Sequence, residues 1–377
     1  MIQIQRFKSS LLFTGFFFFI LCNINSEIFS QSKNYIIPNN LIDIKSEILP
    51  SIDSSDCVIY ISSDQDLIDF SFPGSGSENN PYRLENLSIS TSKDYGIYLE
   101  NTTKYVLIQN CTIYAHYRAI NIYNTAENTI TIKNNTLTSD NYFGMFIAKS
   151  PYINILKNII HNCYHAIEFN DCPYALIANN TLFDNVCCIR VEYSSSYSRI
   201  LENNISNNYE VIKLENSGGH FLIKDNIIIN NNFGIALFRI TGPYYPDYCS
   251  IIHNLIKGTE WYGLVIESNY NTIFHNTFVN NNLEGKSQAK DIGSYNIWYN
   301  ESLNEGNYWS DWLGFDVYHI DGSAKSNDPY PSQFPFHTTN ISTPKNSMGI
   351  VILTLTLGFG CLSLVVISFW IVEKMKK

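Results

Sequence analysis

The chain has 377 residues, of which 45% are hydrophobic and 15% are charged, and its formal net charge is −10. The apolar share is large enough for a buried core, so the composition excludes a chain that is disordered throughout. The acidic balance, together with the lack of a basic patch between the two ends, argues against nucleic acid as a partner.

The first 26 residues are predicted to be a secretory signal peptide. Arg6 and Lys8 precede the apolar run 11–21, which is short for a bilayer span and has the layout of a signal sequence. No clear cleavage site of small residues follows the run, so an uncleaved N-terminal anchor remains the alternative. Residues 27–83 are then expected to form an N-terminal segment and cap.

An internal repeat occupies residues 84–303. Each copy contains the pattern Ile-x-x-Asn-x-Ile or a close variant, as at Ile132, Asn135 and Leu137, and successive copies are 22 to 24 residues apart. One step is 28 residues long, where TGPYYPDY is inserted. A second pattern, a small residue followed by apolar-x-apolar, runs in phase with the first, as in GIAL from residue 234.

These two patterns predict an all-β parallel solenoid of about ten coils, with two short strands per coil and the apolar residues pointing inward. Coils of such a fold stack at about 4.8 Å. The repeated Asn is expected to lie in a tight bend and to bond through its amide to the backbone and to the Asn of the next coil. A leucine-rich repeat is the rival architecture, but the chain lacks the helix or Leu frame that it needs.

The end of the chain is predicted to hold a cap, a stalk and a membrane anchor. Residues 304–330 are expected to cover the open edge of the last coil, with Trp298, Tyr308, Trp309 and Trp312 as capping side chains. Residues 331–347 are predicted to form a stalk. Residues 348–372 are uncharged, apolar and long enough to span a bilayer as a transmembrane helix, and the lysines in the tail 373–377 predict a cytoplasmic C-terminus with an extracellular ectodomain. The predicted localisation is the cell membrane, with a single pass.

Two stretches outside the core of each repeat point to a known family. They are PGSGSENNPYRLENLSI at 73–89 and NIWYNESLNEGNYWSDWLGFD at 296–316, which is followed by DPYP. With them, residues 56–331 resemble the right-handed parallel β-helix repeats of NosD-like and carbohydrate-binding or sugar-hydrolase proteins, especially archaeal surface proteins. The resemblance implies the fold, whereas the same scaffold carries lyases, hydrolases, binding proteins and an accessory factor for copper-enzyme maturation.

Stacking brings equivalent positions of successive coils together, so two outward columns are candidate sites. The first column lies just before the repeated Asn. In it, Glu202 and Asp225 are adjacent carboxylates that would suit acid–base catalysis, with one pKa raised by the other. His253 and His275 are weak candidates for transition-metal ligands. A polar outer face without a site is the alternative reading of this column.

The second column lies on the second strand of the repeat. Its charged residues are His165, Glu168, Arg190, Glu210 and Lys213. They are predicted to bind glycan hydroxyl or carboxylate groups, and aromatic side chains on earlier coils are expected to stack on sugar rings; these are Tyr95, Tyr98, Phe143 and Phe146. Arg190 beside Glu168 and Glu210 is also the only place that resembles the base and calcium–carboxylate cluster of a polysaccharide lyase. A solvent-facing ladder of salt bridges is the alternative.

The leading hypothesis is a membrane-anchored, non-catalytic protein that binds glycans or surface proteins. A polysaccharide lyase or glycoside hydrolase is the first alternative, and a NosD-like accessory factor for metal-enzyme maturation, implied by the resemblance, is the second. Calcium is the one cofactor kept open, although Asp316, Asp321 and Asp328 are too sparse to predict a site. Seven cysteines lie between the apolar ends without a C-x-x-C motif, which leaves room for one or two disulfides, for instance within residues 163–188.

Overall fold

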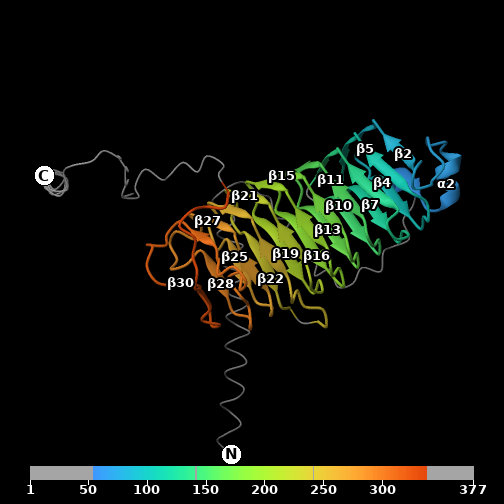
Figure 1. Cartoon of the computed structure of the whole chain (residues 1–377). Coiled ribbons are helices and arrows are strands. Elements are labelled where there is room, and N and C mark those ends of the chain that lie inside the picture. Colours follow the sequence, from blue (N-terminus) through green and yellow to red (C-terminus); the bar gives the residue numbers. More distant parts are fainter. Residues whose placement is uncertain (1–53, 141, 241, 338–377) are drawn as a thin grey trace, which may run out of the picture. The chain divides into compact units, whose positions relative to one another are not determined.

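The computed structural model describes residues 54–140, 142–240 and 242–337, shown in colour in Figure 1. These residues form three parallel sheets that wind around one hydrophobic core. The predicted signal peptide, the transmembrane segment 348–372 and the tail 373–377 lie outside the described residues. In the described part of the chain, none of the helices has the length and apolar character that a membrane crossing requires.

Each coil contributes one strand to each of the three sheets. The first sheet contains β1 (Cys57–Ile61), β4 (Tyr95–Glu100), β7 (Arg118–Tyr123), β10 (Phe143–Ala148), β13 (His165–Asn170), β16 (Cys187–Glu192), β19 (Glu210–Glu215), β22 (Ile235–Phe238), β25 (Leu264–Ile266) and β28 (Ala289–Asp291). The second contains β2 (Tyr82–Glu85), β5 (Val106–Gln109), β8 (Ile130–Lys133), β11 (Asn154–Leu156), β14 (Leu176–Ala178), β17 (Arg199–Leu201), β20 (Leu222–Lys224), β23 (Ser250–Ile252) and β26 (Thr272–Phe274).

The third sheet contains β3 (Ser88–Ser90), β6 (Thr112–Ala115), β9 (Thr136–Ser139), β12 (Ile159–His161), β15 (Thr181–Phe183), β18 (Asn204–Ser206), β21 (Ile227–Ile229), β24 (Leu255–Lys257), β27 (Thr277–Val279) and β29 (Tyr308–Trp309). A short turn η1 (Ser54–Asp56) and helix α2 (Asp64–Asp69) flank β1, and a small antiparallel pair, β30 (Tyr318–His319) and β31 (Asn327–Asp328), follows the last coil.

The second sheet has nine strands, so the described residues form nine complete coils, from β2–β4 to β26–β28. The parallel solenoid is thus confirmed, with three strands per coil instead of the two that were predicted. The difference arises within the Asn-containing pattern, because the residue before the Asn adopts a left-handed backbone. At Asn134 φ is +54°, so the chain turns there, and Ile132 lies in β8 while Leu137 lies in β9.

The predicted asparagine ladder is confirmed. The buried residues Asn135, Asn158, Asn180, Asn203, Asn226, Asn254, Asn276 and Asn307 form a continuous series. Each side-chain Nδ2 donates to Oδ1 of the next member at 2.9–3.1 Å. A second, shorter ladder runs through Asn185, Asn208 and Asn231 and satisfies buried polar groups at the next bend.

The C-terminal end of the core is closed by aromatic side chains. Trp298 and Trp309 are both fully buried, and Trp309 stacks between Phe278 and Tyr318 at ring-centroid distances of 4.2 and 4.1 Å. Trp312 is partly buried and packs against the same core. These residues therefore cover the apolar interior that the last complete coil would otherwise present to water.

The seven cysteines of the described residues are buried free thiols, so the one or two disulfides that the sequence left open are not formed among them. Burial raises the pKa of Cys163, Cys172 and Cys249 to about 12. Because the thiolate is the reactive form, we expect a thiol reagent at pH 7.5 to label none of the seven in the folded protein and all of them in guanidinium. Replacing Cys22 and Cys361 with serine removes the other thiols. Rapid labelling of the folded protein would contradict this prediction.

Candidate functional site

The second predicted column lies on the outward face of the first sheet. Strand register places Glu168 of β13 opposite Arg190 of β16, and Arg190 opposite Lys213 of β19. The neighbouring strands β10 to β25 lie side by side in Figure 1, so residues more than twenty positions apart in sequence become lateral neighbours. The structure therefore brings the predicted charged residues of this column together.

These side chains form two adjacent groups of ion pairs, His165 with Glu168 and the remaining five residues with one another, which we together call the charged strip. It comprises His165, Glu168, Arg190, Glu192, Glu210, Lys213 and Glu215. Nη2 of Arg190 lies 3.1 Å from Oε2 of Glu215 and also pairs with Glu192. Nζ of Lys213 lies 2.9 Å from Oε1 of Glu215 and 3.6 Å from Oε1 of Glu210. At the other end of the strip, Nδ1 of His165 is hydrogen-bonded to Oε2 of Glu168.

Sequence reasoning missed Glu192 and Glu215. Each lies two residues beyond a predicted member, Arg190 on β16 and Lys213 on β19. The two-residue period of a strand places such positions on the same face. The alternation of residues along β16 and β19 therefore predicts both glutamates, provided that each strand is extended to its last residue.

Neighbouring charges favour the ionised forms of Glu168, Arg190 and Lys213, whereas burial raises the pKa of Glu192. Burial acts to raise the pKa of Glu168, but His165 and Arg190 bring that pKa below its ordinary value. Burial acts to lower the pKa of Arg190, but Glu168, Glu192 and Glu215 hold it above its ordinary value. Lys213 behaves in the same way beside Glu210 and Glu215. Both cations thus stay protonated at neutral pH, which opposes the predicted role of Arg190 as a base.

Acidification is expected to weaken the strip. The pKa of Glu168 is lowered in the folded state, so its ionised form stabilises the fold above the unfolded-state pKa of about 4.3, and this contribution is lost as the pH falls through the folded-state pKa. At pH 7, Glu168→Gln should lower the free energy of unfolding by about 1–3 kcal/mol. Urea unfolding of both proteins from pH 7 to pH 3 measures this difference, which should shrink below about pH 4. A difference independent of pH would contradict the assignment.

Three of the four predicted aromatic platforms, Tyr95, Phe143 and Phe146, pack against the buried Arg118, and Tyr98 packs edge-on against Tyr95. Tyr95, Tyr98, Phe143 and Phe146 are only 1–8% exposed. The guanidinium carbon of Arg118 lies 4.0 Å from the ring centroid of Phe146 and 4.9 Å from that of Phe143. The rings thus pack around a cation, a favourable contact for a buried guanidinium, and they do not offer open faces to a sugar. Arg118 could have been found from the sequence. It occupies on β7 the position that Tyr95 occupies on β4 and Phe143 on β10, so stacking places it between them.

The first predicted column keeps its backbone alignment but not the predicted side-chain pair. Glu202 and Asp225 both occupy left-handed bends, with φ of +53° and +56°. Glu202 is exposed, and Asp225 pairs with Lys224 at 3.4 Å. No contact between the two carboxylates occurs among the described residues. The geometry therefore gives no support to an acid–base pair here.

His253 and His275 do lie together, near the end of the coils. Nε2 of His253 is 3.3 Å from Nδ1 of His275, and Nε2 of His275 is 2.7 Å from Oε2 of Glu305. Burial lowers the pKa of His253, and the neighbouring His275 adds to this effect. The ring nitrogens of this cluster are therefore directed at one another and at Glu305.

Two of the three aspartates that were too sparse to predict a calcium site, Asp321 and Asp328, have structural partners. Asp328 is buried and accepts hydrogen bonds from Nε1 of Trp309 and the backbone N–H of Asn307. Asp321 accepts from the hydroxyl of Tyr262 at 3.1 Å. Among residues 54–337 as described, no group of three or more His, Cys, Asp or Glu side chains is arranged to hold a metal ion.

Comparisons with known proteins agree with the repeat. Residues 70–228 match the family model described as "Right handed beta helix region", and residues 192–314 match that described as "Periplasmic copper-binding protein (NosD)". The curated proteins contain no match. Among solved structures, the crystal structure of the Dettilon tailspike protein (gp208) aligns with 15% identity and a TM-score of 0.33 over 62% of each chain. The chain thus spans less than two thirds of that protein.

The copper named in the second family description does not fit the described residues. His253 and His275 lie within the matched segment, but each engages a ring nitrogen in the contact between them. No third ligand completes a site with them in the part of the chain that the structure describes. The described residues therefore give no support to a copper site.

Proposed function

Because the chain is a right-handed parallel β-helix protein with NosD-like repeats, we propose that it is a non-catalytic binding protein that holds a glycan on the charged strip. One observation carries the proposal. Arg190, Glu192, Glu210 and Lys213 keep 20–29% of their side chains exposed while ion pairs fix their positions. Such preorganised charges can bond to hydroxyl and carboxylate groups with little further loss of side-chain freedom.

The same geometry favours binding over cleavage. A polysaccharide lyase needs a neutral or anionic base at the substrate, and the raised pKa values of Arg190 and Lys213 keep both cationic. Glu168 is buried and already accepts a hydrogen bond from His165, so it is poorly placed to reach a bound polymer. These features support a ligand that binds and leaves unchanged.

The proposed place of action is the outer face of the cell membrane. The support is the sequence alone, because the apolar segment 348–372 lies outside the described residues and precedes the lysines of the tail 373–377. A tag at the C-terminus should become accessible to antibody only after the cells are permeabilised, whereas a tag in the loop at residues 242–248 should be accessible on intact cells. The reverse pattern would reject this orientation.

Incubation of the full-length chain with a polysaccharide panel, with and without calcium, tests the proposal. We expect at least one polymer to retain the protein without release of new sugar ends. Lys213→Ala and Glu210→Gln should weaken retention about tenfold each, a loss near 1.4 kcal/mol. Lys224→Ala is the matched control, because Lys224 lies on the second sheet, and it should bind normally.

Two outcomes would overturn the proposal. Release of fragments that is abolished by Glu168→Gln would favour the lyase or hydrolase alternative. Failure of every polymer to bind would reject a glycan ligand for the charged strip. A requirement for calcium would leave binding in place and add the cofactor that the sequence left open.

A further inference from the structure

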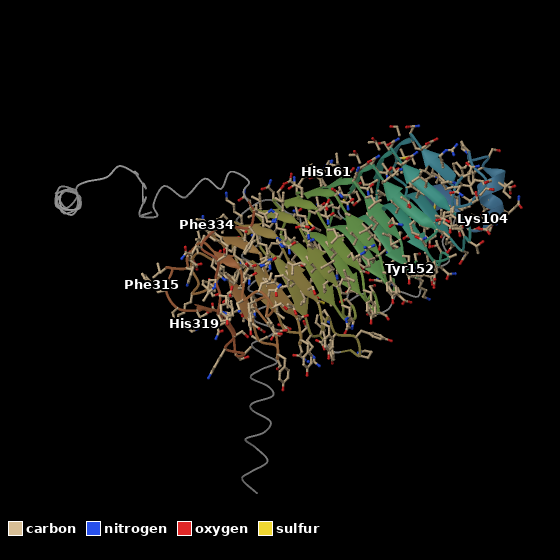
Figure 2. All side chains as sticks on the ribbon, in the orientation of Figure 1. Lys104, Tyr152, His161, Phe315, His319 and Phe334 are labelled. Carbon is tan, nitrogen blue, oxygen red and sulfur yellow. The ribbon has the colours of Figure 1, made fainter. Side chains whose placement is uncertain are left out.

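A column of stacked aromatic rings, separate from the charged strip, follows the corner between the first and second sheets. We call it the aromatic ladder. It consists of Tyr152, Tyr174, Tyr197, His220, Tyr248, Tyr270 and Tyr295, one ring per coil. Successive ring centroids are 4.5–5.3 Å apart, and neighbouring planes are tilted by only 1–10°. Figure 2 labels the first ring, Tyr152, at the outer edge of the coils.

The backbone holds these rings rigidly. All seven residues have φ between +58° and +62°, a conformation that favours glycine or asparagine and is uncommon for tyrosine. The backbone N–H of each of the first six donates to a carbonyl of the next coil at 2.9–3.1 Å. Asparagine occupies the equivalent left-handed position at the other bend, for example at Asn134 and Asn179. The choice of aromatic rings at this corner therefore needs a reason beyond the turn itself.

Ring stacking accounts for only part of that choice. It stabilises the contact between coils, but the six tyrosines remain 38–74% exposed. Each inner ring has both faces covered by its neighbours, so what reaches the solvent is the ring edge and the phenol oxygen. Among the described residues, none of these six hydroxyl groups has a hydrogen-bond partner. The ladder thus presents a straight row of free donor–acceptor groups with the period of the coils.

This arrangement excludes several kinds of ligand. Single-stranded nucleic acid stacks its bases on open ring faces, which the inner rings of the ladder lack. Duplex nucleic acid requires Lys or Arg side chains, and the ladder contains neither. An extended peptide repeats on one face about every 6.5 Å, a poor match to the spacing of the rings. The spacing and the free hydroxyls instead favour a straight, uncharged chain that presents hydroxyl groups with a period close to that of stacked strands.

We propose that the aromatic ladder binds an extended, uncharged polysaccharide that lies along the coil axis, with about one sugar ring beside each aromatic ring. Linear glycans with equatorial linkages form straight ribbons whose sugar rings repeat at a spacing close to that of β-strands. The phenol hydroxyls exchange hydrogen bonds with the sugar hydroxyls, and each contact is weak but repeated along the row. The surface is distinct from the charged strip and does not depend on it.

Retention of the full-length chain on amorphous cellulose, an uncharged β-(1→4)-glucan, tests the inference, with amylose as the coiled α-(1→4) control. We expect retention on cellulose only. Replacing Tyr174, Tyr197 and Tyr248 together with phenylalanine keeps the stack and removes three hydroxyls, so it should weaken retention at least about tenfold while the melting temperature stays unchanged. Replacing the same three with asparagine, which tolerates the positive φ, should abolish retention.

Three results would overturn the inference. They are equal retention on cellulose and amylose, no retention on cellulose, and normal retention of the phenylalanine variant. Lys213→Ala separates this surface from the charged strip. Unchanged retention of that variant on cellulose supports the ladder, whereas its loss would assign the polymer to the strip.

Discussion

Replacing Asn203 with alanine is expected to destabilise the β-helix by about 2–6 kcal/mol. Oδ1 of Asn203 accepts from both the backbone N–H and the side-chain Nδ2 of Asn180, at 2.9 and 3.0 Å, and both contacts are buried. Alanine leaves these two groups without that acceptor, and each buried unsatisfied group costs about 1–3 kcal/mol. Urea unfolding followed by circular dichroism measures the effect.

Asn179→Gly is the matched control for this substitution. Asn179 lies in the same bend, with φ of +58°, but its side chain is exposed. Glycine accepts that backbone conformation, so the free energy of unfolding should change by less than about 0.5 kcal/mol. If Asn203→Ala were as stable as Asn179→Gly, the ladder would contribute little, and apolar packing alone would hold the coils together.

Trp309→Ala is expected to have a similar effect by a different route, a loss of about 3–5 kcal/mol. The ring of Trp309 is fully buried between Phe278 and Tyr318, and its Nε1 donates to Oδ2 of Asp328 at 2.9 Å. Alanine opens a cavity at the end of the core and exposes apolar edges. Association of the protein should therefore increase along with the loss of stability.

Light scattering and urea unfolding together test the role of Trp309. Trp309→Phe should retain part of the stacking and lose less stability than alanine. Trp261→Ala serves as the surface control, because Trp261 is 47% exposed and should tolerate truncation. A cap that contributes nothing would show equal stability for Trp309→Ala and Trp261→Ala.

The sequence predicted those features that recur in every coil. The inward Ile positions, the buried Asn and the lateral neighbours Glu168, Arg190 and Lys213 all follow from one period, because stacking converts a period into contacts. The repeat period did not reveal that each coil contains a third strand. Two consecutive Asn residues, such as Asn134 and Asn135, have different roles. Asn134 adopts the left-handed bend and Asn135 belongs to the hydrogen-bonded ladder, and residue type alone did not distinguish them.

Side-chain partners were predicted less well than positions. The rings of Phe143 and Phe146 lie where the pattern placed them, but their faces are occupied by Arg118, a contact that depends on rotamers. The aromatic ladder was missed because its residues fall in the turns, outside the apolar patterns that defined the repeat. The signal was present in the sequence, because Tyr174 and Tyr197 each lie three residues before the repeated Ile and therefore recur with the period of the coils.

The asparagine ladder also gives the β-helix an internal polarity. The bonds between ladder members all point toward the C-terminal coil, from Asn135 onward to Asn307, and the last member donates to the carboxylate of Asp328. Each Nδ2 also donates to a carbonyl of the preceding coil, as Asn135 does to Ile108, so the polarity lies in the Asn-to-Asn series. Aligned hydrogen bonds polarise one another, so the series ends where a negative charge accepts it best. A chain truncated before Asp328 would lose this acceptor, which also receives the backbone N–H of Asn307 at 2.7 Å and Nε1 of Trp309 at 2.9 Å. Truncation at that end would therefore leave two buried donors without this partner.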